Sequence, residues 1–196
     1  MESQPTWAPM RWTIPDAESM HEFGRELASR LRAGDLIVLN GPLGAGKTTL
    51  TRGLGDGLSV RGSVTSPTFV LARTHPSTID GHPLVHVDAY RLATAVELDD
   101  LDIDFANSVV VVEWGRGMLD GIADSWLDIE INRPTGASQA EPPAGADTSA
   151  DASAAAVDED LNLDFDLDEP RTVTITAFGP RWAGPSEFDG LLGRIG

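Results

Sequence analysis

Apolar side chains recur at spacings of three and four residues in parts of the chain, which is the spacing of one face of an α-helix. The first such pattern follows a potential N-cap at Asp16 and ends at Gly34, and it is made by Met20, Phe23, Leu27 and Leu31. A second covers residues 47–58, where glycines at positions 53, 55 and 57 weaken the helical pattern. A third, acidic and amphipathic, covers residues 95–105. We therefore expect three helices.

Shorter apolar runs predict strands between these helices. Residues 36–39, 84–87 and 109–112 are almost wholly apolar, as in strands buried on both faces of a parallel sheet. Residues 126–131 and 172–178 alternate apolar and polar side chains, as half-buried strands do. The mixture of strands and helices predicts an α/β fold, with a central, largely parallel sheet flanked by helices and a C-terminal antiparallel hairpin.

A glycine-rich loop lies between the first buried strand and the second helix. Its sequence, GPLGAGKT at residues 41–48, fits the pattern G-x-x-x-x-G-K-[ST] in full and has the strand and helix that this motif requires. Glycines let backbone N–H groups and the helix N-terminus point at phosphates. Lys47 would bridge the β- and γ-phosphates, and the Thr48 hydroxyl would bind Mg²⁺. The residues expected to contact the nucleotide are Gly41, Pro42, Leu43, Gly44, Ala45, Gly46, Lys47, Thr48 and Thr49.

Two acidic residues follow the other buried strands. Asp88 comes directly after LVHV, and Glu113 comes directly after VVVV. Because the carboxyl ends of parallel strands meet at one edge of a sheet, both should lie beside the glycine loop. A P-loop ATPase needs such acids to hold the metal and to orient water. We therefore assign catalytic roles to Lys47, Asp88 and Glu113, and metal binding to Thr48 and Glu113.

Three further residues are candidates for a nucleotide-sensing switch: Ser66, Thr68 and Trp114. Ser66 and Thr68 belong to a polar SPT bend, which could order against the γ-phosphate as switch loops do in other P-loop proteins. A turn hydroxyl and a buried indole explain these residues equally well. His86 is interpreted as an ordinary core or surface histidine of its strand.

The charge and composition limit the classes of partner. A net charge of −17 argues against a protein that holds DNA or RNA by itself, because a phosphate backbone requires clustered Lys and Arg. Lys47 is the only lysine of the chain, and it lies inside the glycine loop. Cysteine is absent, which excludes disulfides and thiolate metal sites. With no signal-peptide pattern and no apolar run near the roughly 20 residues that span a bilayer, we expect a cytoplasmic protein without membrane contact.

The segment 134–170 differs in composition from the rest of the chain. It carries ten acidic residues and no basic ones, and it is rich in Ala, Pro, Ser and Gly. Such a segment buries too little apolar surface to offset its chain entropy, so we expect a disordered acidic insertion within the C-terminal hairpin. Residues 1–11 are expected to be a flexible start, and residues 12–196 a single P-loop ATPase domain.

Four segments, in this order, resemble the TsaE (YjeE) family: GPLGAGKTT at 41–49, SPTF at 66–69, HVDAYRL at 86–92 and VVVVEW at 109–114. The similarity runs from Ile14 to Arg133 and resumes at Arg171. This family is the ATPase component of bacterial tRNA threonylcarbamoyladenosine synthesis. The resemblance implies a P-loop NTPase-like domain that binds ATP and Mg²⁺ and hydrolyses ATP slowly. Its implied partners are TsaB and TsaD homologues, with tRNA reached indirectly through their complex.

The resemblance also implies roles for individual residues. Lys47 and Thr48 match the family's phosphate and Mg²⁺ residues, Asp88 its second-motif acid, and Glu113 a metal-binding acid. Thr68 falls in its first switch-like segment. The insertion at 134–170 departs from the family's compact hairpin, so contacts made there by relatives do not transfer.

Other P-loop classes share the glycine loop. A small-molecule kinase is the main alternative, although it commonly needs an arginine-rich lid, and only Arg91 and Arg116 follow the two acid motifs closely. A GTPase would require an Asn-Lys-x-Asp segment, and with Lys47 committed no lysine remains to supply it. A nucleotide-binding scaffold without turnover also fits the binding residues.

Overall fold

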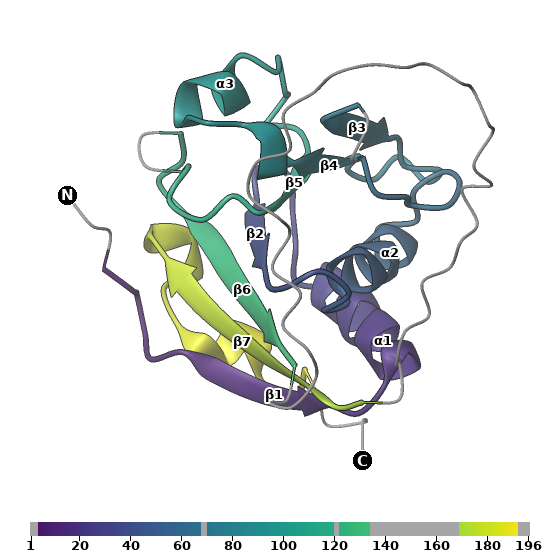
Figure 1. The fold of residues 1–196 in the computed structure, drawn as a ribbon, viewed down its shortest axis with the longest axis vertical. Coiled ribbons are helices and arrows are strands. Elements are labelled where there is room, and N and C mark those ends of the chain that lie inside the picture. Colours follow the sequence, from purple (N-terminus) through teal and green to yellow (C-terminus); the bar gives the residue numbers. More distant parts are fainter. Residues whose placement is uncertain (1–3, 68–69, 120–121, 134–168, 192–196) are drawn as a thin grey trace, which may run out of the picture.

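One sheet of seven strands runs through the protein (Figure 1). The computed structural model describes residues 4–67, 70–119, 122–133 and 169–191. The strands are β1 (Met10–Ile14), β2 (Leu36–Asn40), β3 (Ala72–His75), β4 (Leu84–Asp88), β5 (Val109–Glu113), β6 (Trp126–Asn132) and β7 (Arg171–Phe178). Their order across the sheet is β1-β7-β6-β2-β5-β4-β3.

The sheet is parallel in its centre and antiparallel at both margins. The four central strands, β6, β2, β5 and β4, pair in parallel. At the margins, β3 pairs antiparallel with β4, and β7 pairs antiparallel with both β6 and β1. The predicted single α/β domain is confirmed. The predicted parallel character describes the central strands only, and the predicted C-terminal hairpin corresponds to the antiparallel pair β6 and β7.

The short apolar runs became buried strands because both faces of the central sheet are covered. All five residues of β2, of β4 and of β5 are buried. In β2, Ile37 and Leu39 face a core shared with α1 (Ala17–Ala28) and α2 (Lys47–Gly57), whereas Leu36 and Val38 face a second core. Leu98 of the short helix α3 (Ala95–Asp99) packs into that second core. Helices therefore flank the sheet, as predicted.

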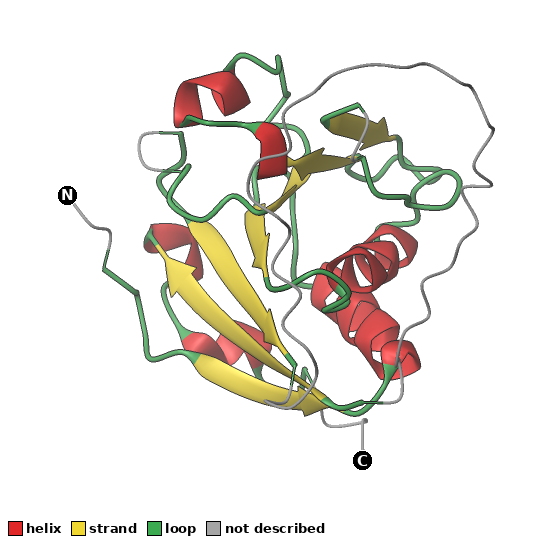
Figure 2. Ribbon diagram, in the orientation of Figure 1, coloured by secondary structure: helices red, strands yellow, loops and turns green. Residues whose placement is uncertain are grey.

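Helices α1 and α2 lie side by side on one face of the sheet (Figure 2). Glycines allow their backbones to touch. A Cβ atom on Gly53 would lie 2.0 Å from the carbonyl oxygen of His21, and one on Gly24 would lie 2.3 Å from the carbonyl oxygen of Leu50. Gly53 and Gly57 of the second helix are thus explained by close packing against α1, whereas Gly55 makes room for the side chains of Val60 and Val64.

Two helices end earlier than their apolar patterns predicted. Helix α1 stops at Ala28, where the Ser29 hydroxyl binds the carbonyl oxygen of Glu26, although we expected it to reach Gly34. Helix α3 stops at Asp99, whereas we expected helix to residue 105. Asp102 has a φ of 51°, in the left-handed region, and a right-handed helix does not continue through such a residue.

Described residues near both ends of the chain, such as Pro5 and Phe188, pack against the sheet margin. We expected residues 1–11 to be flexible, but Pro5 bridges to Phe178 and strand β1 already begins at Met10. Trp7 packs against Phe188, which belongs to the 3₁₀ turn Pro185–Phe188. Further 3₁₀ turns in the described part of the chain are Ala89–Arg91 and Pro180–Trp182. Nearly all of the predicted insertion, residues 134–168, lies outside the described residues. Among the described helices, none has the length and apolar character needed to cross a bilayer.

Candidate active site

The glycine loop connects β2 to α2 in the form that its sequence predicts. Gly41, Gly44 and Gly46 all have positive φ angles, of 144°, 73° and 105°. At Gly41 a side chain is also excluded by contact, because a Cβ atom would lie 2.4 Å from the carbonyl oxygen of Ile131. Helix α2 then begins at Lys47 with no side-chain cap on its first turn. The loop and the helix N-terminus together form a backbone geometry that suits an anion.

Lys47 folds back over this loop. Its side chain is 5% exposed, and its ammonium group donates hydrogen bonds to the carbonyl oxygens of Gly41, at 2.9 Å, and Pro42, at 3.1 Å. The ammonium also lies 3.9 Å from the centre of the Trp114 ring, in a cation–π contact. Burial lowers the pKa of Lys47, and the negative charges of Glu113 and Asp88 oppose this effect. The ammonium is therefore poorly solvated and would gain from phosphate oxygens.

Asp88 and Glu113 face the loop from neighbouring parallel strands. They are direct register partners at the ends of β4 and β5, and both are buried. The Thr48 hydroxyl lies 3.4 Å from Oε1 of Glu113, which links the first turn of α2 to this acid. Asp88 accepts a hydrogen bond from the backbone N–H of Tyr90, at 3.0 Å. The structure thus brings together the lysine, the hydroxyl and the two acids predicted from three separate motifs.

The donor set is one of hard oxygens. Carboxylates and a hydroxyl suit Mg²⁺, which retains several waters and is commonly completed by substrate phosphates. Within the described ranges, no group of three or more His, Cys, Asp or Glu side chains is arranged to hold a metal ion by itself. The arrangement around Thr48 and Glu113 therefore fits a metal ion that arrives with a nucleotide.

Of the three switch candidates, the structure describes Ser66 and Trp114, while Thr68 lies outside the described residues. Ser66 is exposed. Trp114 has a φ of 63°, which is rare for a bulky residue. The backbone N–H of Trp114 donates a hydrogen bond to the carbonyl oxygen of Leu39, at 3.0 Å. The Trp114 ring meets the Tyr90 ring edge-on, with 5.6 Å between the ring centres. Strained backbone of this kind concentrates at functional sites.

His86 is a member of the site that the sequence analysis did not assign. It is fully buried, and its Nε2 lies 2.8 Å from Oε1 of Glu113. A signal was present in the sequence, because His86 stands two residues before Asp88 and therefore on the same face of the strand.

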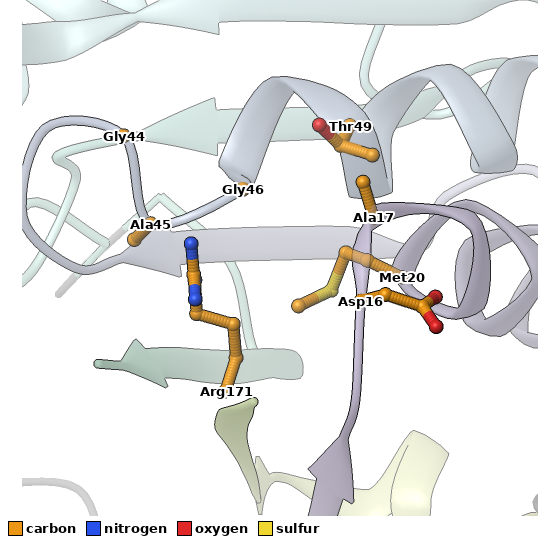
Figure 3. A pocket seen from close by; sticks show the side chains of 8 residues that line it. All are labelled: Asp16, Ala17, Met20, Gly44, Ala45, Gly46, Thr49 and Arg171. Atoms are coloured by element: carbon orange, nitrogen blue, oxygen red, sulfur yellow. The ribbon is translucent and has the colours of Figure 1, made fainter. Parts of the chain in front are cut away.

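A pocket adjoins the other side of the glycine loop (Figure 3). It is lined by Asp16, Ala17, Met20, Gly44, Ala45, Gly46, Thr49 and Arg171. The guanidinium of Arg171 is buried, donates a hydrogen bond to the carbonyl oxygen of Glu169, and points toward Ala45 of the loop. Thr49, the last residue of the predicted nucleotide contacts, therefore lies in a depression between α1, β7 and the loop.

Comparison with known proteins places this geometry in a family. A family model described as "Threonylcarbamoyl adenosine biosynthesis protein TsaE" matches residues 14–140. The chain belongs to the TsaE family. The resemblance expected from the four motifs is thereby confirmed, and the matched range includes the glycine loop and both acids of this TsaE-family chain.

Individual relatives agree with the family match. A protein of Streptomyces coelicolor named "tRNA threonylcarbamoyladenosine biosynthesis protein TsaE" is 51% identical over 167 residues, which are 84% of this chain and 94% of the relative. A Bacillus subtilis protein of the same name is 32% identical over 127 residues, which are 63% of this chain and 78% of the relative. The crystal structure of Bacillus subtilis YdiB superposes with a TM-score of 0.63 at 25% identity and covers 96% of this chain and 97% of YdiB.

Proposed function

We propose that this protein is the ATP-binding and ATP-hydrolysing component of the tRNA threonylcarbamoyladenosine modification machinery, supporting turnover of a complex of TsaB and TsaD homologues. The observation that carries the proposal is the meeting of Lys47, Asp88 and Glu113 around the glycine loop, in a chain of the TsaE family. Contact with tRNA is then indirect, through the complex, in agreement with the acidic charge of the chain. The location we propose is the cytoplasm.

Lys47 and the loop amides bind the triphosphate. The ammonium group exchanges the carbonyl oxygens of Gly41 and Pro42 for oxygens of the β- and γ-phosphates, which are stronger, charged acceptors. The N–H groups at the start of α2 hold the same phosphates by their dipoles.

Thr48 and Glu113 hold the magnesium ion, and Asp88 orients the attacking water. Thr48 contributes its hydroxyl and Glu113 its carboxylate, which already lie 3.4 Å apart. The ion supplies charge neutralisation between the β- and γ-phosphates when it is bound. Asp88, beside Glu113 on the next strand, accepts a hydrogen bond from water at the open edge of the sheet. The loop containing Ser66 and Thr68 orders on the γ-phosphate and relaxes after hydrolysis, so that a partner reads the nucleotide state.

Reconstitution tests the proposal. Purified chain is mixed with TsaB and TsaD homologues, tRNA, ATP and the threonylcarbamoyl donor, and modified tRNA is counted per molecule of TsaD. We expect multiple turnover only when the wild-type chain is present, and no multiple turnover when Lys47→Met replaces it. Turnover that is equal without the chain, or full with the variant, would remove the assignment. Measuring inorganic phosphate beside ADP separates hydrolysis from the kinase alternative, since a kinase transfers the phosphoryl group to an acceptor other than water.

A further inference from the structure

The buried contact between His86 and Glu113 links the interior of the sheet to the candidate metal site. Leu84, His86 and Asp88 occupy one face of β4, because alternate residues of a strand share a face. The register places His86 opposite Val111 and Asp88 opposite Glu113, so that Glu113 is the diagonal neighbour of His86 on β5. The ring reaches across this diagonal, with Nε2 at 2.8 Å from Oε1 of Glu113. His86 is fully buried and lies directly behind the two acids.

We propose that His86 is a positioning residue, which fixes the carboxylate of Glu113 for metal binding without touching the metal or the nucleotide. The proposal rests on the magnesium–nucleotide site proposed above. Glu113 has a long side chain, and a glutamate without a partner would sample several rotamers. A hydrogen bond to one carboxylate oxygen removes that freedom before the ligand arrives.

The chemistry of the pair defines the proton on His86. An ionised carboxylate only accepts hydrogen bonds, so Nε2 must carry the hydrogen and donate it to Oε1 of Glu113. The other ring nitrogen, Nδ1, is buried and has no hydrogen-bond partner among the described residues, so Glu113 is the polar group that the ring contacts. Donation from this one ring N–H orients Glu113 and leaves its second carboxylate oxygen available for a cation. Arginine or lysine at the same place would neutralise the negative charge of Glu113.

Thr48 does not replace His86 in this role. Its hydroxyl is also near Oε1 of Glu113, but at 3.4 Å the contact is long. In the proposed function the oxygen of the Thr48 hydroxyl would bind the metal ion, so the position of this hydroxyl would be set by the ion and not by Glu113. His86 then remains as the residue that orients the carboxylate while the nucleotide is bound.

Two amide substitutions of different reach test the role. The side-chain nitrogen of glutamine in His86→Gln reaches the position of Nε2, whereas the shorter asparagine in His86→Asn reaches only that of Nδ1. The affinity for ATP is measured by calorimetry with Mg²⁺ and with EDTA, and the ratio of the two affinities gives the magnesium effect. We expect His86→Asn to lower the magnesium effect about 10-fold and His86→Gln to keep it within about threefold. An unchanged ratio in His86→Asn would overturn the proposal.

His75 supplies a matched control. It is a second buried histidine, on the neighbouring strand β3, and its Nε2, like Nδ1 of His86, lacks a hydrogen-bond partner among the described residues. We expect His75→Asn to change thermal stability while the magnesium effect stays that of the wild type. A reduced ratio in both asparagine variants would mean that the loss follows from a loosened core, which contradicts a specific role of His86. A wild-type protein with no magnesium effect would instead contradict the proposed function itself.

The wild-type protein allows an independent measurement, which does not depend on whether a variant folds. Nitrogen-15 NMR of the imidazole rings distinguishes a protonated ring nitrogen from one with a lone pair. We expect a hydrogen on Nε2 of His86. A lone pair on Nε2 would rule out donation to Glu113 and overturn the proposal.

Discussion

Replacing Lys47 by methionine should separate ligand binding from folding stability. The ammonium of Lys47 is nearly inaccessible to water, and burial lowers its pKa more than Glu113 and Asp88 raise it. The folded, nucleotide-free protein therefore holds this charge less well than the unfolded chain does. Methionine fills a similar volume without the charge. We expect the free energy of unfolding without nucleotide to change by less than about 1 kcal/mol, and upward rather than downward.

The loss of affinity for magnesium–ATP should be much larger than this change in stability. In the proposed complex the ammonium forms charge-assisted hydrogen bonds to phosphate oxygens, each of which contributes about 1.5–3 kcal/mol. Part of this is offset by the carbonyl contacts with Gly41 and Pro42 that must first be broken. A net loss of about 2–4 kcal/mol is expected, which corresponds to a roughly 30- to 1,000-fold weaker affinity for magnesium–ATP.

Urea unfolding and calorimetry measure the two effects separately. Arg52→Met is the control, because Arg52 is an exposed cation of the same helix that donates to the carbonyl oxygen of Val64, away from the glycine loop. Its affinity for nucleotide should equal that of the wild type. The reasoning would be refuted if Lys47→Met bound magnesium–ATP as tightly as the wild type, or if it lost several kcal/mol of stability without nucleotide.

The lowered pKa of Lys47 adds a pH dependence with a defined sign. Below the folded-state pKa the full cost of burying the charge is present. As the pH rises from that value toward 10.5, the ordinary pKa of a lysine, the unfolded chain binds more protons than the folded one, and stability rises. The wild type should therefore gain stability relative to Lys47→Met in this alkaline range, which is seen by comparing urea midpoints of the two proteins. A constant difference would contradict the buried charge.

Three further variants test the framework, each by urea unfolding. Gly53→Ala should lower the free energy of unfolding by about 2 kcal/mol, because the new Cβ would meet the backbone of α1. Helix propensity alone would raise it by about 1 kcal/mol, so equal stability would contradict that contact. Asp16→Ala should lower the free energy of unfolding by about 1 kcal/mol, because Asp16 caps α1 by accepting a hydrogen bond from the backbone N–H of Ser19. Hydrogen bonds from Ser19 lower the pKa of Asp16, so this difference from the wild type should vanish as the pH falls below 3.8. Arg181→Leu should cost about 3 kcal/mol by leaving the buried Asp35 carboxylate without its cation, and a loss below about 1 kcal/mol would contradict this.

The sequence predicted the centre of the molecule well, because several signals agreed there. The runs at 36–39, 84–87 and 109–112 are buried on both faces, and each leads into a polar residue or loop at the same edge of the sheet. Parallel strands bring such ends together wherever they lie in the chain. The meeting of Lys47, Asp88 and Glu113 could therefore be anticipated from local patterns.

Features that depend on contacts between distant segments could not be anticipated in this way. The pairing of β1 with β7 at the sheet margin leaves no pattern in the nearby sequence, so Met10 and Pro5 were assigned to a flexible start. Helix propensity counted against Gly53, because the carbonyl of His21 that explains it belongs to another helix. For His86 the sequence showed only part of the signal: its place two residues before Asp88 is visible there, but its contact with Glu113 on the neighbouring strand is not.

The register of β6 and β7 makes this hairpin a natural grafting position for protein engineering. Asn132 lies opposite Thr172, so the two strand ends stay close whatever the length of the connection between them. For a flexible connection, each halving of its length favours the folded state by only about 0.6 kcal/mol, and each doubling costs as little. A fluorescent reporter or an affinity tag inserted at this point would stand beside the glycine loop, because β6 ends at the same edge of the sheet as β2 and the carbonyl oxygen of Ile131 lies against Gly41. It would therefore report on the nucleotide edge from close by.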